Sequence, residues 1–358
     1  MVSVASVVGQ GAAVPAPMGQ SELWEGFFRD HYAANATAER VWRGAGIATR
    51  HGVVNPVDED VSRWGTGARM RRYAVEALPL GKEAVAAALA DAGLDARQVG
   101  LLAVASCTGY TTPGIDISLG RDLGMTADLQ RLMVGHMGCY AALPALGAVA
   151  DFVVARSRPA VLLCLELTSL HVQPASESAQ GPEATVADVE QMVAHALFSD
   201  AAAALVLRPD VPGLEVVDVV AHTDVSTSDH MTWDVTDLGF RMGLSARVPG
   251  VLARHVRAVV DQLLGRHGLT IGDVAGWAVH PGGRRIVEVV GERLGLTAED
   301  LQASYDVLRD YGNASSATVL LVLDSLRRSR TFAPGEVVVA MAFGPGLTLY
   351  AALLRQSA

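Results

Sequence analysis

Two stretches of this chain repeat each other at a fixed distance along the sequence. LADAGLDARQVGLLAVASC begins at Leu89, and LGRHGLTIGDVAGWAVHPG begins at Leu264, 175 residues later. This offset is about half of the 358 residues, so the sequence predicts a duplicated chain whose two halves share one fold. A turn-rich segment, RPDVPG, predicts the boundary, with one half over 1–212 and the other over 213–358. The recurring residues are Leu89, Gly93, Leu94, Val99, Ala103 and Val104, matched by Leu264, Gly268, Leu269, Val274, Ala278 and Val279.

The hydrophobic pattern around the repeat predicts an α/β fold. In each half a helix leads into an apolar strand, and a second helix and strand follow. Near-continuous apolar strands are covered on both faces by helices, so two stacked halves predict a layered αβαβα body. The helices expected lie at 82–93, from 139 onward, at 251–268 and at 313–328; the strands expected lie at 99–107, 160–167, 198–207, 214–226, 276–280, 336–344 and 348–355.

Composition excludes several classes of protein. The chain is 50% hydrophobic with a mean hydropathy of +0.29, which suits one or two compact domains with a large core. A formal charge of −10 without a basic cluster argues against binding to nucleic acid or an anionic membrane. The sequence contains no run of 18 uncharged apolar residues that would predict a membrane-spanning helix. A signal peptide requires basic residues near its start, and here no Lys or Arg occurs before Arg29. We therefore expect a cytoplasmic protein.

The three cysteines differ in the positions they occupy. Their number is odd, and no CxxC or Cys/His spacing typical of a metal site occurs, which indicates free thiols and no metal. Cys164 lies inside an apolar strand and is expected to pack, whereas Cys107 ends a strand and either lines a pocket or packs. Cys139 follows the turn HMG at a helix start, where unpaired N–H groups favour thiolate over thiol. Cys139 is therefore the expected nucleophile, with a packing role as the alternative.

A histidine and an asparagine in the second half are the expected partners of this thiol. His280 ends the second copy of the repeat, and the following Pro-Gly-Gly turns the chain so that the imidazole is presented at the strand tip. An imidazole there can hold Cys139 as thiolate through an ion pair and can donate to an oxyanion. Asn313 lies 174 residues after Cys139, at the equivalent place in its half, and its carboxamide suits an oxyanion donor. A pseudo-twofold axis would bring the three groups together.

Four segments carry a family resemblance. VGHMGCYAALPAL, WAVHPGG, YGNASSATVLLVLD and AFGPGLT resemble, in order and spacing, the signatures of bacterial type III polyketide synthases, the chalcone-synthase-like homodimers of the thiolase superfamily. The resemblance implies a thiolase-like fold and acyl-CoA and malonyl-CoA as substrates, with no metal or redox cofactor. It also implies that Cys139 takes a starter acyl group from coenzyme A. His280 and Asn313 would hold the malonyl thioester carbonyl during loss of carbon dioxide, and the enolate would attack the acyl-Cys139 thioester.

The same resemblance assigns residues to the walls of the substrate chamber. Phe198 matches the gatekeeping phenylalanine between the coenzyme A tunnel and the chamber, and Met242 replaces a second phenylalanine there. Thr168 and Ser315 keep the residue types of the family, and His171 replaces a threonine that lines the cyclisation pocket.

The remaining assignments lie at the edges of the chamber. Arg40 matches a basic position at the coenzyme A entrance and Arg43 lies nearby, so both are expected near the phosphates. Ile117 matches the residue that reaches into the partner's cavity across the dimer interface. Gly344 and Pro345, from AFGPGLT, complete the expected substrate-binding set together with Cys107.

The product class is an expectation with alternatives. We expect an acyl starter extended by a few units from malonyl-CoA or a substituted malonyl-CoA, then closed to a pyrone or resorcinol-type ring. One alternative is a tetrahydroxynaphthalene-type or dihydroxyphenylacetate-type synthase that uses malonyl-CoA alone. Another is a ketoacyl-carrier-protein synthase of the initiating type, which resembles HPGG and FGPGLT less well. A papain-like hydrolase and a non-catalytic thiolase-fold subunit are the remaining alternatives, and the retained Cys, His and Asn argue against the latter.

Overall fold

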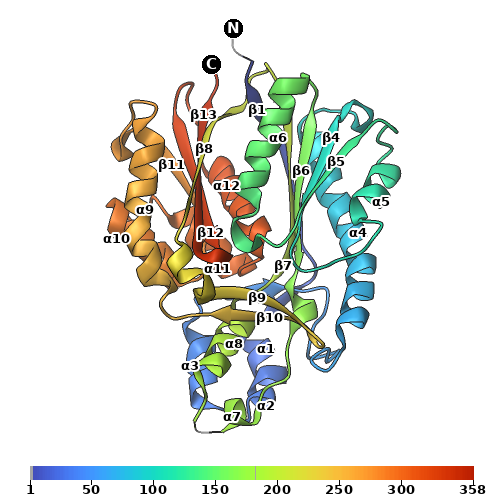
Figure 1. The fold of residues 1–358 in the computed structure, drawn as a ribbon, viewed down its shortest axis with the longest axis vertical. Helices are drawn as coiled ribbons and strands as arrows, with labels where there is room; N and C mark the ends of the chain where they lie inside the picture. The colour runs from blue at the N-terminus through green and yellow to red at the C-terminus, as the bar shows by residue number, and fades with distance from the viewer. Residues whose placement is uncertain (1–2, 182) are drawn as a thin grey trace.

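Helices and strands alternate along most of the chain in the computed structural model, which describes residues 3–181 and 183–358 (Figure 1). The strands are β1 (Ala5–Ala13), β2 (Pro17–Gly19), β3 (Thr49–His51), β4 (Leu101–Ala105), β5 (Gln130–Val134), β6 (Ala160–Leu167), β7 (Asp200–Pro209), β8 (Leu214–Thr223), β9 (Met231–Thr236), β10 (Gly239–Leu244), β11 (Val274–Val279), β12 (Val337–Gly344) and β13 (Thr348–Gln356). The α-helices are α1 (Gln20–Leu23), α2 (Arg29–His31), α3 (Ala36–Gly44), α4 (Thr66–Asp91), α5 (Ile115–Asp122), α6 (Ala142–Arg156), α7 (Glu177–Gln180), α8 (Val186–Leu197), α9 (Val248–Gly265), α10 (Arg284–Leu294), α11 (Gln302–Tyr311) and α12 (Thr318–Ser329).

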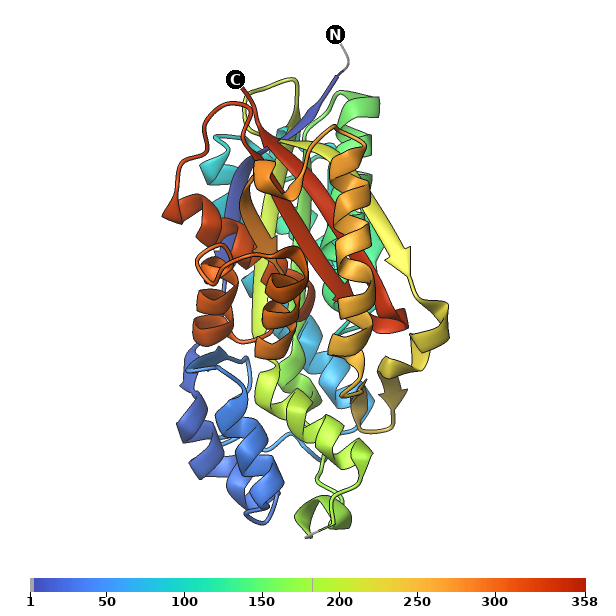
Figure 2. The same cartoon turned by 90° about the vertical axis from the view of Figure 1, so that its left-hand side faces the viewer.

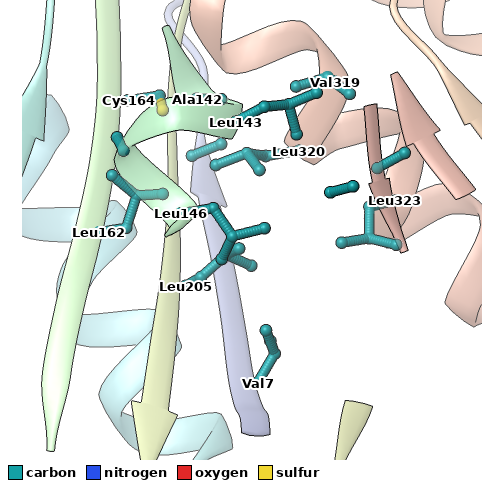
Figure 3. Close-up of a cluster of buried hydrophobic side chains, with 14 of the residues drawn as sticks. Val7, Ala142, Leu143, Leu146, Leu162, Cys164, Leu205, Val319, Leu320 and Leu323 are labelled. Carbon is teal, nitrogen blue, oxygen red and sulfur yellow. The ribbon is translucent and has the colours of Figure 1, made fainter. Parts of the chain in front are cut away.

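The body has the predicted five layers. Across Figure 1, α9 and α10 cover the β11, β12, β13 and β8 side of the sheet, and α4 and α5 cover the β6, β4 and β5 side. Between these two parts of the sheet lie α6 and α12, whose leucines meet at the centre (Figure 3). The central contact includes Leu146 of α6 and Leu320 and Leu323 of α12, all 1% exposed. The layered αβαβα expectation is confirmed.

The duplication is visible in the strand pairing. In the order β1-β7-β6-β4, two antiparallel pairs are followed by a parallel pair, and β8-β13-β12-β11 repeats this pattern. The two sets join into one nine-stranded sheet where Ser6 and Val7 of β1 pair with Glu215 and Leu214 of β8. The first half alone carries a further edge strand, β5, which pairs with β4.

The repeated sequence segment builds the same helix ending twice. Gly93 after α4 and Gly268 after α9 have φ of +58° and +66°, a left-handed conformation that glycine adopts without a steric penalty. In both places the next leucine closes the turn: Leu94 N donates to Leu89 O at 2.9 Å, and Leu269 N donates to Leu264 O at 3.0 Å. The strands β4 and β11 follow, so the same sequence motif ends a helix and starts a strand in each half.

The prediction that the first helix begins near residue 82 was wrong, because α4 begins at Thr66 and contains Pro79. Strand β1, which the sequence pattern did not predict, explains how this long helix is held. A Cβ on Gly9 of β1 would lie 2.4 Å from Ala88 O, and one on Gly11 would lie 2.4 Å from Ala84 O. Two glycines that weaken β propensity therefore allow α4 to pack directly on β1.

One segment, Gly138–Arg156, is long and apolar enough to cross a membrane by length and composition. It includes α6, and 61% of its apolar window is buried in the protein, between the two parts of the sheet. The segment is thus a core helix in this structure.

The shorter helices gather at one end of the layered body. Figure 2 shows α1, α2 and α3 beside α8 at this end, and the hairpin β9–β10 crosses between them and the sheet in Figure 1. Helix α8 packs against both α3 and β10. The candidate active site lies at this junction.

Candidate active site

Cys139, His280 and Asn313 line one cavity of about 400 Å³. They come from the turn before α6, the end of β11 and the loop before α12. The structure therefore brings together the three side chains that the pseudo-twofold argument placed at one site. The other walls come from α8, β10, the segment 245–249 and the start of α10.

Cys139 lies in a tight 3-10 turn that leads into α6. Gly138 has a φ of +72°, and a Cβ on it would lie 2.7 Å from Pro345 Cδ, so only glycine fits before the cysteine. A Cβ on Gly344 would lie 3.2 Å from Cys139 N, so Gly344 makes room for this turn. Burial raises the pKa of the Cys139 thiol to about 12, which the nearby Ser315 hydroxyl only partly offsets. The expectation that the helix start lowers this pKa was wrong for this structure, because desolvation outweighs it.

His280 is fully buried directly after β11, with its backbone N–H bonded to Met341 O at 2.8 Å. Among the described residues, neither ring nitrogen has a hydrogen-bond partner. Burial lowers the pKa of the imidazole to about 3, so it is neutral at physiological pH. A buried imidazole whose N–H donor and nitrogen acceptor both lack hydrogen bonds lowers the stability of the folded protein unless a ligand in the cavity binds to it. The imidazole is therefore available to a ligand.

The Asn313 carboxamide is oriented by its own loop. Its Oδ1 accepts from Ser315 N at 2.9 Å, and its Nδ2 donates to Gly282 O at 3.4 Å, a long bond. With the oxygen occupied and one amide hydrogen in this long bond, the second Nδ2–H is left for the cavity that Asn313 lines. The helix expected from Asn313 instead begins at Thr318, after a 3-10 turn. Asn313 forms a backbone bridge with Phe198, which takes it out of the helix.

Phe198 and Met242 lie on the boundary between the large cavity and a second, smaller space. Both residues line both cavities, and the smaller one measures about 20 Å³ between Cys107 and Cys139. Trp233 reduces this space: it pairs with Met242 across the hairpin β9–β10 and donates its Nε1–H to Cys107 O at 2.8 Å. Trp233 was not predicted as a site residue, because its only signal in the sequence is that it is an aromatic residue in an otherwise polar segment.

Thr168 and His171 follow β6, and the polar atoms of both side chains form hydrogen bonds within the protein. Thr168 Oγ1 donates to Ser199 O at 2.8 Å. His171 Nε2 bonds to Thr108 O at 2.6 Å, and its Nδ1 accepts from Phe240 N at 3.0 Å, which fixes the neutral tautomer. Burial lowers the pKa of His171 to about 4. The donors of both side chains are therefore used within the protein, while Thr168 also lines the smaller cavity and His171 lines a further space of about 50 Å³ beside Phe198.

Cys107 and Ser315 lie behind Cys139, next to a buried carboxyl group. Glu166, fully buried on β6, accepts from Cys107 N at 3.0 Å and from Ser316 Oγ at 2.6 Å. Burial raises the pKa of Glu166 and that of the Cys107 thiol. Cys107 Sγ and Ser315 Oγ are 3.7 Å apart, and both residues line the smaller cavity. The alternative in which Cys107 lines a pocket is thus the one the structure supports.

The other expected site residues lie away from the catalytic groups. Arg40 and Arg43 are on α3, where Arg43 pairs with Glu39 at 2.7 Å and is 70% exposed. Ile117 is 45% exposed on α5. The cation that does line the large cavity is Arg285 on α10, which pairs with Glu288 and Glu292. Arg285 was not predicted; its signal in the sequence is its place five residues after His280, behind the Pro-Gly-Gly turn.

The large cavity is mostly apolar. Beside the polar residues Thr185, Glu190, Ser245 and Arg285, it is lined mainly by apolar side chains. They are Ala184, Val186, Val189, Val193 and Leu197 of α8 or its approach, with Met231, Leu244, Val248, Ile286 and Phe343 from the facing elements. A dry wall of this kind lowers the local dielectric and strengthens any hydrogen bond made at the catalytic end.

Sequence models of a known family match nearly the whole chain. The family "Chalcone and stilbene synthases, N-terminal domain" matches residues 3–211, and "Chalcone and stilbene synthases, C-terminal domain" matches residues 218–358.

Individual relatives agree with these matches. The chain is 34% identical to "Alpha-pyrone synthesis polyketide synthase-like Pks18" of Mycobacterium tuberculosis over 87% of this chain and 80% of that protein. It is 33% identical to "1,3,6,8-tetrahydroxynaphthalene synthase" of Streptomyces peucetius, covering 90% and 84%. A solved 1,3,6,8-tetrahydroxynaphthalene synthase from Streptomyces coelicolor superposes with a TM-score of 0.90 at 26% identity, over 99% of both chains. The chain therefore belongs to the chalcone and stilbene synthase family and is a type III polyketide synthase, an acyltransferase of a family that uses acyl-CoA and malonyl-CoA.

Proposed function

We propose that Cys139 carries the growing acyl chain while His280 and Asn313 drive decarboxylation of malonyl-CoA. One observation carries this assignment: a buried imidazole whose two nitrogens have no hydrogen-bond partner among the described residues shares a mostly apolar cavity with a thiol and a carboxamide that has one unused N–H. A neutral imidazole has one acceptor and one donor, so it can serve both the thiol and a thioester oxygen in turn.

The first step loads the starter. His280, neutral in the folded protein, accepts the Cys139 proton as the sulfur attacks the acyl-CoA carbonyl, and the imidazolium so formed is stabilised by the negative charge that develops on the carbonyl oxygen. The bond between the acyl carbon and the coenzyme A sulfur breaks, and the leaving thiolate takes the proton from His280. The products are acyl-Cys139 and free coenzyme A.

The second step makes the carbon–carbon bond. The malonyl thioester oxygen accepts hydrogen bonds from Asn313 Nδ2–H and from the His280 N–H. The malonyl carboxylate then leaves as carbon dioxide, and its electron pair forms the enolate. The enolate carbon attacks the acyl-Cys139 carbonyl, the bond to sulfur breaks, and the Cys139 thiolate takes a proton from solvent. The apolar walls favour loss of the charged carboxylate as a neutral gas.

The walls of the cavity support an apolar starter and few extensions. About 400 Å³ lined mostly by aliphatic side chains suits an acyl chain or an aromatic ring, and Trp233 leaves only about 20 Å³ beside Cys107. We favour closure to a pyrone or resorcinol-type ring. A synthase that uses malonyl-CoA alone is the second candidate, favoured by the 33% identity to a tetrahydroxynaphthalene synthase.

Incubation of the purified protein with malonyl-CoA and a series of acyl-CoAs tests this function, with mass spectrometry of the products and measurement of carbon dioxide. Pyrone or resorcinol masses that include the starter support the proposal. Polyketide from malonyl-CoA alone supports the second candidate. Absence of carbon dioxide release with every substrate overturns both, and Cys139→Ala is the control for product that does not depend on the acyl-enzyme.

We also propose a homodimer formed along the β5 edge. The unpaired edge of β5 carries Leu132 and Met133, which are 36% and 51% exposed, and Ile117 of α5 is 45% exposed. A partner would cover these apolar side chains and the free strand edge. Arg285, together with Arg40 of α3, is proposed to meet the coenzyme A phosphates.

The division into halves 1–212 and 213–358 and the cytoplasmic location are likewise proposals. The division into halves is supported by the repeated strand pairing, in which the order β1-β7-β6-β4 of the first half matches the order β8-β13-β12-β11 of the second. The cytoplasmic location is supported by the three free thiols, which suit a reducing compartment.

A further inference from the structure

Arg50 is a charged side chain buried beside the active site without touching the cavity of the catalytic groups. It lies on β3, is 5% exposed, and burial lowers its pKa to about 9, so it is still protonated at neutral pH. The guanidinium carbon lies 4.9 Å from the centre of the Trp42 ring. A buried cation is costly unless it makes strong contacts, so the partners of Arg50 indicate what it does.

The hydrogen-bond partners of Arg50 are the last carbonyl groups of α8, and the buried carboxyl group of Asp200 is the nearby charge that partly offsets the effect of burial on its pKa. Arg50 Nη1 donates to His195 O at 2.5 Å and to Phe198 O at 2.9 Å. Carbonyls at a helix end lack partners within the helix and carry partial negative charge, so a guanidinium there satisfies both needs. Phe198 is the C-cap residue of α8, and its backbone position is therefore tied to Arg50.

The same backbone segment holds Asn313. Asn313 N donates to Leu197 O at 2.9 Å, and Ser199 N donates to Asn313 O at 3.0 Å, so Asn313 lies directly across from Phe198. The stem of Arg50 also lies close to Gly312, the residue before Asn313: a Cβ on Gly312 would lie 3.2 Å from Arg50 Cγ. Arg50 therefore binds one segment of the bridge, at Phe198, and lies beside the other, at Gly312.

We propose that Arg50 is a positioning residue that holds the Phe198–Asn313 bridge in the geometry needed for malonyl-CoA decarboxylation. The inference rests on the proposed role of Asn313. Loss of the guanidinium frees the Phe198 carbonyl and loosens the loop that aims Asn313 Nδ2 at the thioester oxygen. Because oxyanion stabilisation falls steeply when a donor is misplaced, decarboxylation should suffer more than loading of Cys139.

Arg69 provides a matched control for a merely structural role. It is fully buried and also donates to backbone carbonyls, namely Trp64 O at 2.8 Å, Ser62 O at 3.0 Å and Leu170 O. None of these acceptors belongs to the Phe198–Asn313 bridge. Arg69→Met should therefore lower thermal stability about as much as Arg50→Met while affecting the two half-reactions equally.

The experiment compares two half-reactions in Arg50→Met, Arg50→Lys and Arg69→Met. Loading of Cys139 is followed by the mass of the intact protein after mixing with hexanoyl-CoA, and decarboxylation by carbon dioxide release from malonyl-CoA. For Arg50→Met we expect kcat of decarboxylation to fall about 100-fold, with loading reduced less than about 5-fold. Arg50→Lys keeps the charge and should recover part of the loss. If Arg50→Met does not fold, Arg50→Lys and Arg50→Gln serve for the same comparison.

A double variant separates the possible failures. In an Asn313→Ala background, Arg50→Met should lower decarboxylation by less than about 3-fold, because the residue it positions is already absent. Equal loss of both half-reactions in the single variant, or a full additional loss in the double variant, overturns the positioning role. If the unaltered protein releases no carbon dioxide, or Asn313→Ala releases it at the normal rate, the proposed function fails instead.

Discussion

Cys139 and Asn313 hold equivalent places in the two halves, yet their surroundings differ. The Cys139 turn passes directly into α6, and burial raises the pKa of its thiol. The Asn313 loop first joins a backbone bridge with Phe198, and its carboxamide oxygen accepts from Ser315 N. The duplicated scaffold thus supplies two matched positions, and the local contacts decide which becomes a nucleophile and which an oriented donor.

Removing the nucleophile should have the largest effect. Cys139→Ala should lower polyketide formation by at least about 10⁴-fold, because the variant lacks the thiol that forms the acyl-enzyme. Decarboxylation should persist in part, since His280 and Asn313 remain. Intact-protein mass after acyl-CoA treatment and product analysis measure the two effects. Cys164→Ala, which changes a core residue on β6, is the matched control and should still load an acyl group. Acylation of Cys139→Ala at the normal rate would contradict the comparison.

Removing the donor should have a smaller and more selective effect. Asn313→Ala should lower carbon dioxide release from malonyl-CoA by roughly 100- to 1000-fold while loading of Cys139 is partly retained. The measurement is carbon dioxide release beside intact-protein mass. Asn35→Ala, which removes the N-cap side chain of α3, is the matched control for stability. Equal losses in loading and decarboxylation would show that Asn313 does not act selectively in decarboxylation.

Buried histidines extend the comparison to stability. His171 in the first half and His280 in the second have folded-state pKa values of about 4 and about 3, below the usual 6.5, because burial disfavours the charged ring. Between pH 6.5 and 4 the unfolded chain binds more protons than the folded one. The contribution of these two histidines to the free energy of unfolding is therefore complete above pH 6.5. It falls as the pH drops, by up to about 1.4 kcal/mol per pH unit for each histidine.

Denaturant unfolding at a series of pH values measures this slope. His171→Gln and His280→Gln should each make this slope shallower. An unchanged slope in both variants would mean that neither ring titrates between the folded and unfolded states.

The helix endings provide the smallest and most symmetrical test. Gly93→Ala and Gly268→Ala each place a Cβ at a positive φ where no atom lies within 4 Å, so only the backbone strain of about 1–2 kcal/mol is added. Both variants should lower the midpoint of one shared unfolding transition by similar amounts. Two separate transitions, or strongly unequal shifts, would show that the halves are not equivalent structural units. Gly272→Ala, at a negative φ in an uncrowded turn, is the control.

The layered fold could be predicted because hydrophobic periodicity is visible within short segments and the duplication is visible when two such segments are compared. The apolar strands at β6 and β12, the helices before them and the repeated glycine ending all appear in the sequence as short patterns. Strand β1 and the start of α4 could not be predicted in this way. Gly9 and Gly11 weaken a strand and Pro79 weakens a helix, and both elements are stabilised by packing on each other.

The sequence by itself determined the chemistry of the site: which residues could attack, accept a proton or donate to an oxyanion, and that symmetry would bring them together. The tertiary structure decided how those groups are tuned. Desolvation raises the pKa of Cys139 and lowers that of His280, Trp233 narrows the chamber, and Arg50 joins Phe198 to the Asn313 loop. These effects depend on neighbours distant in sequence, and burial and backbone contacts of that kind have no local signature.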